Sequence, residues 1–292
     1  MRNPTHGGRP HGERPHGECP RPVRPHGGRH ELGQNFLVDQ SVIGLFTDLV
    51  ARTSGPIVEI GPGDGAITLP LSRTGRPLTA VELDPRQARR LARRVPGHVD
   101  VVTADVLRYR FPREPHTVVG NLPFHLTTSL LRRLLETDHW RHAVLLTQWE
   151  VARRRAGVGG ATMLTAAWWP WYEFALHARV PARAFRPMPS VDGGLLTMAR
   201  RHTALIAERP GPYQEFVRQV FTGPGHGLRE ILDRTGRFAG STPRDWLRYE
   251  RLSPTALPRQ LTAGQWAALW QLAEPARKPG GPAARAGRRR SG

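Results

Sequence analysis

The chain has 292 residues, enough for one large domain or two of ordinary size, and its formal net charge is +19. All but one of its 43 basic residues are Arg, which favours nucleic acid over an anionic membrane surface as partner; a high G+C genome would give the same bias. No apolar run approaches the roughly 18 residues of a membrane-spanning helix, no signal peptide is visible, and the single cysteine, Cys19, excludes an internal disulfide. We therefore expect a cytoplasmic protein without a membrane partner.

Both ends of the chain are basic and rich in Gly and Pro. Residues 6–30 repeat a five-residue unit of the type HGGRP, and such segments cannot bury apolar area. Residues 1–30 and 275–292 are therefore predicted to be disordered, with no metal site in the His-containing repeat. Residues 1–30 carry six Arg against two Glu, and residues 275–292 carry five Arg, one Lys and no acid. A net charge of +9 remains on residues 31–274, which suits contact with RNA.

The middle of the chain alternates short apolar runs with stretches of helical spacing. The runs are typical of strands and lie at Ile57–Ile60, Leu78–Glu82, Val99–Thr103, Thr117–Gly120, Ala143–Thr147 and Leu195–Met198. Helical spacing is present over residues 42–50, 66–72 and 130–135. This alternation predicts an α/β domain over residues 31–204. Its sheet should be mainly parallel and covered on both faces, with ligand at the carboxyl ends of the strands.

From about residue 205 the strand pattern stops. Four helix-like segments separated by Gly and Pro follow, at Tyr213–Phe221, Leu228–Asp233, Pro243–Tyr249 and Thr262–Leu272. They predict a small all-helical carboxyl-terminal domain over residues 205–274, to which we assign contacts with RNA.

A glycine loop, Gly61-Pro62-Gly63-Asp64-Gly65, follows the first predicted strand. Glycine lets the backbone turn sharply and approach a ligand closely. Glu82, at the end of the next strand, is placed to accept hydrogen bonds from two ribose hydroxyls. Gly61-x-Gly63-x-x-Ala66 also satisfies the dinucleotide fingerprint, with Glu82 at about the distance expected for its ribose acid. The loop alone therefore fits an NAD-dependent oxidoreductase and an S-adenosylmethionine-dependent enzyme almost equally well.

Three further features favour S-adenosylmethionine as cofactor. Glu59 precedes the loop, where its carboxylate would repel a pyrophosphate but suits the cationic ammonium and sulfonium of S-adenosylmethionine. Asp105 ends the third strand, where it can accept a hydrogen bond from the amine of the cofactor's adenine; taken alone, it could equally be a helix cap. Asn121-Leu122-Pro123-Phe124 follows the fourth strand, at the open end of the sheet.

The Asn-Leu-Pro-Phe tetrapeptide is suited to an adenine amine. That amine is a poor nucleophile because its lone pair is delocalised into the ring, and acceptors for both N–H groups favour the pyramidal nitrogen. The side-chain carbonyl of Asn121 and the main-chain carbonyl of Leu122 can supply these acceptors, while Pro123 restricts the backbone. Phe124 offers a face on which a base can stack once it leaves its neighbours. The tetrapeptide predicts methyl transfer to adenine, without a dedicated catalytic base.

Taken together, these motifs resemble the ribosomal RNA adenine N6-methyltransferases. The matching segments, in order, are Gln34–Leu37, Glu59–Gly65, Val81–Asp84, Ala104-Asp105, Asn121–Phe124 and Val180–Asp192. The resemblance covers about residues 30–235. It implies a Rossmann-like methyltransferase domain with S-adenosyl-L-methionine as cofactor.

The resemblance also implies roles for single residues. The cofactor site would be lined by Asn35, Leu37, Gly61, Gly63, Glu82, Asp105 and Asn121. The target adenine would be held by Asn121, Leu122 and Pro123 and sandwiched between Phe124 and Phe185. Phe185 taken alone would be read as a core residue.

Two branches of that family share these motifs. One dimethylates 16S rRNA during ribosome biogenesis, and the other, the Erm group, methylates 23S rRNA and confers macrolide, lincosamide and streptogramin B resistance. Phe124, where the first branch usually has Tyr, and the Arg-rich run Gln148–Gly157 favour the Erm group. We therefore expect a monomeric 23S rRNA methyltransferase without a stable protein partner. A further alternative is a non-catalytic RNA-binding protein that keeps the pocket but has lost its activity.

Arginines on or beside two helix-like segments are predicted to contact RNA phosphates: Arg132, Arg133, Arg153, Arg154 and Arg155. Each taken alone would equally be part of a solvated helix surface. Trp168, Trp169 and Trp171 lie in an apolar run and are assigned to the core or a domain interface rather than to stacking on bases.

Overall fold

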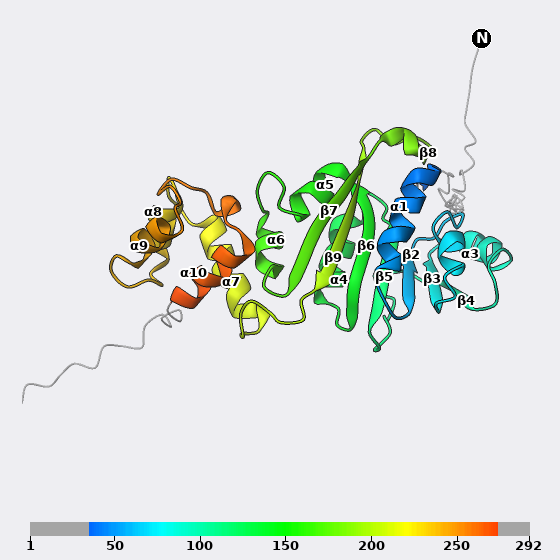
Figure 1. Ribbon diagram of the computed structural model, residues 1–292, viewed down its shortest axis with the longest axis horizontal. Helices are drawn as coiled ribbons and strands as arrows, with labels where there is room; N and C mark the ends of the chain where they lie inside the picture. The colour runs from blue at the N-terminus through cyan, green and yellow to red at the C-terminus, as the bar shows by residue number, and fades with distance from the viewer. Residues whose placement is uncertain (1–34, 274–292) are drawn as a thin grey trace, which may run out of the picture. The chain divides into compact units, whose positions relative to one another are not determined.

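The central sheet has seven strands in the computed structural model, which describes residues 35–273. Their order is β4-β3-β2-β5-β6-β9-β7 (Figure 1). The strands are β2 (Ile57–Ile60), β3 (Leu78–Glu82), β4 (Val99–Thr103), β5 (His116–Asn121), β6 (Trp140–Gln148), β7 (Tyr172–Val180) and β9 (Gly193–Arg200). The first five in this order pair in parallel, whereas β9 pairs antiparallel with both β6 and β7.

The strand order reverses between β2 and β5, which are neighbours although β3 and β4 lie between them in the sequence. In open α/β sheets such a switch point opens a crevice at the carboxyl ends of the strands. The register places Ile60 opposite Gly120. Gly61 and Asn121 therefore leave adjacent strands at the same edge of the sheet.

Helices cover both faces of this sheet, as the sequence predicted for an α/β fold. The helices of this part are α1 (Gln40–Ala51), α2 (Thr68–Ser72), α3 (Pro85–Ala92), α4 (Thr127–Glu136), α5 (Trp149–Arg155) and α6 (Met163–Trp168). Buried side chains of α1 share one apolar cluster with Ile57 and Val119, while those of α4 share another with Ile60 and Val118. Because adjacent strand residues point to opposite faces, strands buried on both sides read as continuous apolar runs.

The chain after β9 is helical in the described range. It forms α7 (Pro210–Thr222), α8 (Leu228–Thr235), α9 (Thr242–Tyr249) and α10 (Ala263–Leu272), which pack around a third apolar cluster that includes Phe216 and Trp266. Ala166 and Ala167 of α6 belong to the same cluster, and Trp168, Trp169 and Trp171 pack against it. The α/β class with carboxyl-terminal helices is thus confirmed, while the domain limits at residues 204 and 274 stay predictions.

The structure also contains strands that the sequence did not predict. Between its buried ends, the edge strand β7 alternates exposed and half-buried residues and carries Glu173, His177 and Arg179, so it lacks the continuous apolar run of the inner strands. Two short strands, β1 (Phe36–Leu37) and β8 (Phe185–Arg186), pair with each other in a separate sheet. Two residues are too few for any periodic pattern.

The predictions made for the two tails lie outside the described residues. Between residues 35 and 273, no helix is long and apolar enough to cross a membrane.

Candidate active site

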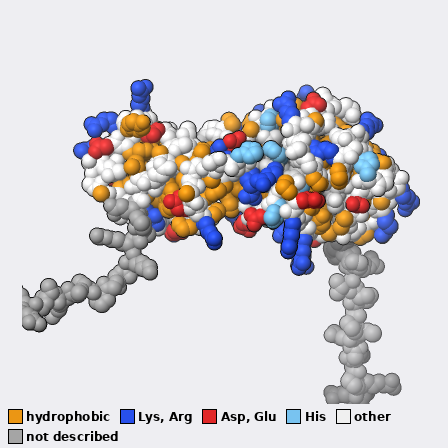
Figure 2. Space-filling model, turned by 60° about the horizontal axis from the view of Figure 1, so that its bottom comes forward, with side chains coloured by type: hydrophobic (Ala, Val, Ile, Leu, Met, Phe, Trp, Pro, Cys, Tyr) orange, Lys and Arg blue, Asp and Glu red, His pale blue; other side chains and the backbone are white. Residues whose placement is uncertain are grey.

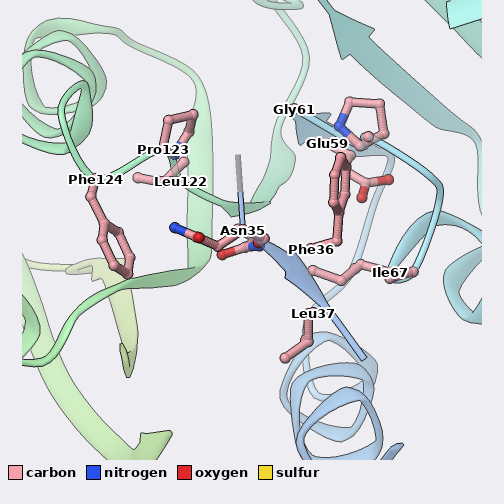
Figure 3. A pocket seen from close by; sticks show the side chains of 13 residues that line it. Asn35, Phe36, Leu37, Glu59, Gly61, Ile67, Leu122, Pro123 and Phe124 are labelled. Atoms are coloured by element: carbon pink, nitrogen blue, oxygen red, sulfur yellow. The ribbon is translucent and has the colours of Figure 1, made fainter. Parts of the chain in front are cut away.

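A pocket lies at the switch point of the sheet, where β2 and β5 end. Its walls come from three segments that are far apart in the sequence (Figure 3). The lining residues are Asn35, Phe36, Leu37, Glu59, Gly61, Pro62, Gly63, Ala66, Ile67, Asn121, Leu122, Pro123 and Phe124. The fold therefore brings the glycine loop, the amino-terminal segment and the Asn-Leu-Pro-Phe tetrapeptide around one cavity.

The glycine loop needs its glycines. Gly61 and Gly63 have φ of +63° and +53°, a left-handed conformation that other residues rarely adopt. A Cβ on Gly63 would lie 2.8 Å from Cε1 of Phe36. The backbone of Gly63 therefore packs directly against the Phe36 ring, with no room for a side chain between them.

Glu82 lies beneath the loop and is buried. Its Oε2 accepts a hydrogen bond from the Gly63 N–H at 3.1 Å, and its Oε1 accepts one from the Asp84 N–H at 2.9 Å. The carboxylate therefore helps to hold the loop, and it does not line the pocket. Its expected contact with ribose hydroxyls stays a prediction.

Asp105 follows β4 at the same edge of the sheet. The Ala104 N–H donates to the Glu82 carbonyl at 2.9 Å, which places Asp105 beside the end of β3. One carboxylate oxygen caps the Leu107 N–H at 2.9 Å, and the side chain is 42% exposed. The local capping role is present, and the predicted contact with a cofactor adenine remains untested.

Glu59 presents a buried carboxyl group to the pocket. Its side chain is 1% exposed, and Oε2 finds no hydrogen-bond partner among the described residues. Burial raises the pKa of Glu59 to about 7; the neighbouring Thr68 hydroxyl, itself without a hydrogen-bond partner within residues 35–273, opposes the rise, and the nearby Glu82 charge adds to it. A buried acid with an unpaired oxygen fits a cationic group of a ligand, so the donor set suits the ammonium and sulfonium of S-adenosylmethionine.

We expect the affinity for S-adenosylmethionine to fall at low pH because of Glu59. Below its pKa of about 7 the free protein holds the Glu59 proton, and a bound cation favours the carboxylate, so binding must release that proton. The affinity should drop by about tenfold per pH unit below neutrality until the complex protonates too. Calorimetric titration across pH would measure this. Glu59→Gln should bind more weakly and without the slope; an unchanged slope in this variant would assign the proton to another group.

The Asn-Leu-Pro-Phe tetrapeptide is held by its neighbours. The Asn121 Nδ2 group donates to the main-chain carbonyl of Asn35 at 2.7 Å, which fixes the orientation of the amide. The Leu122 N–H donates to the Leu146 carbonyl at 2.9 Å, and the Pro123 carbonyl accepts from the Leu126 N–H at the start of α4. Figure 3 shows the rings of Phe124 and Phe36 on opposite sides of Asn35.

Phe185 lies apart from the pocket lining. Its side chain is fully buried in the core, and its ring packs where a Cβ on Gly193 would lie only 3.1 Å away. Only its backbone, in β8, pairs with β1 beside the pocket. The sandwich of a base between Phe124 and Phe185 stays a prediction that requires the Phe185 ring to move.

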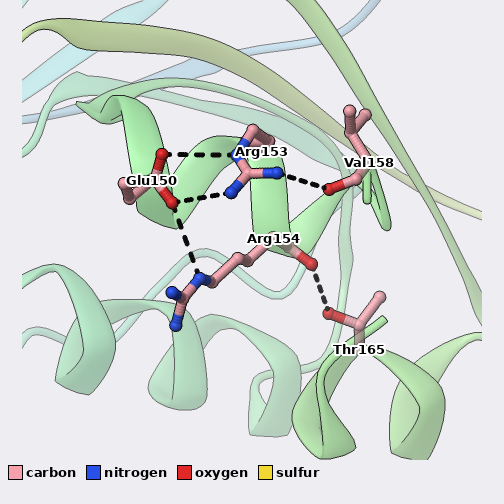
Figure 4. Close-up of polar contacts among 5 residues, drawn as sticks. All are labelled: Glu150, Arg153, Arg154, Val158 and Thr165. Atoms are coloured by element: carbon pink, nitrogen blue, oxygen red, sulfur yellow. Dashed lines mark hydrogen bonds and ion pairs between the residues drawn. The ribbon is translucent and has the colours of Figure 1, made fainter. Parts of the chain in front are cut away.

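The five predicted RNA-binding arginines differ in their surroundings, and Figure 4 shows those of Arg153 and Arg154. Arg153 pairs with Glu150 at 2.9 Å and also donates to the Val158 carbonyl, while Arg154, 63% exposed, is 3.7 Å from the same carboxylate. Arg132 is exposed on α4. These three present charge at or near the surface, and their contact with RNA remains a prediction.

The other two arginines of this set are half-buried and make contacts within the protein, and their contact with RNA also stays a prediction. The Arg155 guanidinium donates to Thr162 Oγ1 at 2.6 Å; burial, together with Arg132 and Arg154, lowers its pKa to about 10. Arg133 donates to the Tyr109 carbonyl and lies over the ring of Phe111.

On the face seen in Figure 2, basic side chains are more prominent than acidic ones.

Several lining residues were not assigned from the sequence. Phe36, Pro62, Ala66 and Ile67 are apolar and carry no chemical signal of their own. Phe36 could have been found because it lies within the matched segment Gln34–Leu37. Residues 35–273 contain no cluster of three His, Cys, Asp or Glu side chains that could hold a metal ion.

Comparisons with known proteins identify the family. The model of the ribosomal RNA adenine dimethylases matches residues 26–272. The chain is 54% identical to the mycinamicin-resistance protein MyrB of Micromonospora griseorubida, over 91% of this chain and 86% of that protein. It is 52% identical to an rRNA adenine N-6-methyltransferase of Corynebacterium diphtheriae, over 72% and 84% of the two chains.

The solved structure of the 23S rRNA methyltransferase ErmE is similar in fold as well as in sequence. It has a TM-score of 0.76 and 31% identity, and the match covers 82% of this chain and 99% of that one. With the family model matching most of its length, this chain belongs to the ribosomal RNA adenine dimethylase family, as its motifs predicted, and not to the NAD-dependent oxidoreductases.

Proposed function

We propose that this protein transfers a methyl group from S-adenosylmethionine to N6 of one adenine in the peptidyl-transferase region of 23S rRNA. The modified base would obstruct bound macrolides, lincosamides and streptogramin B and so confer resistance. The observation that carries the proposal is the single pocket in which Glu59 and the glycine loop face Asn121 and Phe124.

Different residues of the pocket would bind two ligands, the cofactor and the target adenine. Bound S-adenosylmethionine supplies a methyl group activated by its sulfonium charge. Glu59 and the loop Gly61–Gly63 would hold this cation, while Glu82 keeps the loop in place through the Gly63 N–H. Catalysis then depends on positioning and electrostatics.

The adenine amine is prepared by acceptors on the chain. The Asn121 Nδ2 group is engaged with Asn35, which leaves Oδ1 as the acceptor for one amine N–H, and the Leu122 carbonyl would accept the other. Both bonds favour the pyramidal nitrogen, whose lone pair forms the new N–C bond as the C–S pair returns to sulfur. The product then loses an N–H proton to solvent. Phe124 would stack on the flipped base.

Two similarities favour 23S over 16S rRNA as the substrate. The relative from Micromonospora griseorubida is named for resistance to mycinamicin, and ErmE is a 23S rRNA methyltransferase. We further propose that the protein acts as a monomer and that Arg132, Arg153 and Arg154 contact RNA phosphates. The helices α7–α10 would add contacts to the RNA backbone.

Methylation of purified 23S and 16S rRNA with labelled S-adenosylmethionine tests the proposal, with the modified base mapped by primer extension. We expect label at one adenine of the 23S peptidyl-transferase loop and a raised inhibitory concentration of macrolides in cells that express the protein. Label in 16S rRNA alone would assign the protein to the biogenesis branch. Transfer to neither RNA would contradict the proposal.

A further inference from the structure

The short strand β1 is the point where the cofactor and target parts of the pocket meet. Its residues Phe36 and Leu37, together with Asn35, line the cavity. Neither Phe36 nor Leu37 carries a group that could take part in methyl transfer. What distinguishes the segment is that it contacts three other parts of the site at once.

The first contact is with the glycine loop. The Phe36 ring lies directly on Gly63, since a Cβ built there would come within 2.8 Å of Cε1 and 3.1 Å of Cδ1 of the ring. Gly63 in turn donates its N–H to Glu82. A ligand that occupies the loop must therefore share space with the Phe36 ring.

The second contact is with the segment that carries Phe185. Phe36 pairs with Arg186 and Leu37 pairs with Phe185 in the antiparallel register of β1 and β8. The Val38 N–H extends the contact by donating to the Ala184 carbonyl at 2.8 Å. A displacement of β1 is thus transmitted to the backbone of Phe185.

The third contact is with the target-binding tetrapeptide. The Asn35 carbonyl accepts the hydrogen bond from Asn121 Nδ2 that fixes the orientation of the catalytic amide. The strand β1 and its flanking residues Asn35 and Val38 therefore connect the cofactor loop, the Asn121 amide and β8. Packed and hydrogen-bonded chains of this kind carry energetic coupling between sites.

We propose that β1 couples the two binding sites, with Phe36 as a positioning residue, so that an occupied cofactor pocket strengthens the binding of target RNA. The inference rests on the proposed function, because it requires an adenine-bearing RNA as the second ligand. A ligand against the glycine loop would hold the Phe36 ring in one position, and the pairing of β1 with β8 and Asn121 would hold the base pocket in its binding geometry.

The coupling is measured as the ratio of two dissociation constants for one RNA. The probe is a hairpin of the 23S peptidyl-transferase loop, titrated by fluorescence anisotropy without and with saturating S-adenosylhomocysteine. Coupling of ordinary strength gives a ratio of roughly 5–150, and the affinity for S-adenosylhomocysteine must change by the same factor when RNA is present. A structural defect would lower both affinities without changing this ratio.

Two variants test the proposed role of β1, each by removing a different one of its contacts. Phe36→Ala removes the ring from Gly63. Val38→Pro leaves the pocket-lining residues unchanged and removes the shorter of two bonds to the Ala184 carbonyl, 2.8 Å from the Val38 N–H against 3.3 Å from the Asp39 N–H. Both should bring the ratio toward 1, and both should still bind S-adenosylhomocysteine at saturation. Val38→Ala keeps the N–H, trims a side chain that is 43% exposed and should keep the wild-type ratio.

The outcomes separate the two proposals. If the wild-type protein does not bind the hairpin, the proposed function fails. If it binds both ligands with a ratio of 1, the function stands and the coupling is absent. A wild-type ratio well above 1 that survives both Phe36→Ala and Val38→Pro would overturn the assignment of the coupling to β1.

Discussion

Asn121→Ala is expected to lower the rate of methyl transfer by roughly 10²–10³-fold, the usual effect of removing one preorganised hydrogen-bond group from a reacting centre. The variant loses the side-chain acceptor for the adenine amine and the donor to the Asn35 carbonyl, which sits 2.7 Å from Nδ2. The affinity for S-adenosylhomocysteine should fall much less, because the glycine loop and Glu59 are unchanged. Single-turnover methylation of 23S rRNA, together with calorimetry, would separate the two effects.

Two further variants sharpen this test. Asn121→Asp keeps an acceptor but replaces the donor with an oxygen that repels the Asn35 carbonyl, so it should also be impaired. His125→Ala alters an exposed neighbour of Phe124 and should retain wild-type activity. Activity of Asn121→Ala within a few-fold of wild type would remove this residue from the proposed mechanism.

Gly63→Ala is expected to weaken S-adenosylmethionine binding by about two orders of magnitude. An Ala residue at φ +53° is strained by roughly 1–2 kcal/mol. Its Cβ would also meet the Phe36 ring at 2.8 Å, and relieving such overpacking costs about 1–3 kcal/mol. The ring or the loop must shift, and either movement changes the wall of the pocket. Calorimetric titration with S-adenosylhomocysteine measures the loss.

Gly75→Ala is the matched control for backbone strain. Gly75 has φ +69°, but a Cβ there meets no atom within 4 Å, and the residue does not line the pocket. Both variants should lose stability in thermal melts through backbone strain, Gly63→Ala more so because its Cβ also meets the Phe36 ring, whereas only Gly63→Ala should lose cofactor affinity. Equal affinities in the two variants would show that the Gly63 contact with Phe36 does not shape the cofactor site.

The limits of three parallel strands were predictable because their runs are mainly apolar, although β4 is an edge strand with two exposed residues. The predicted limits of Ile57–Ile60, Leu78–Glu82 and Val99–Thr103 agree with β2, β3 and β4. Each is a short apolar run bounded by turn residues, and that pattern depends only on local sequence. β5, β6 and β9 extend beyond the predicted limits by one to three residues at each end, where residues outside the aliphatic runs continue the pairing.

The sequence by itself also determined the family, because the motifs at Glu59–Gly65 and Asn121–Phe124 combine residue types and order that few families share. The place of the pocket followed as well, since both motifs directly follow parallel strands.

Only the tertiary structure decided how the residues around that pocket are used. The ring of Phe36 on Gly63 and the burial of Phe185 depend on contacts between segments that are far apart in the sequence. The Thr162 partner of Arg155 depends on how the chain turns between α5 and α6. The pairing of β1 with β8 joins residues that lie about 150 positions apart in the sequence. Periodicity reports which face of an element is buried, but which neighbour covers that face is set by the order of the strands and the packing of the folded chain.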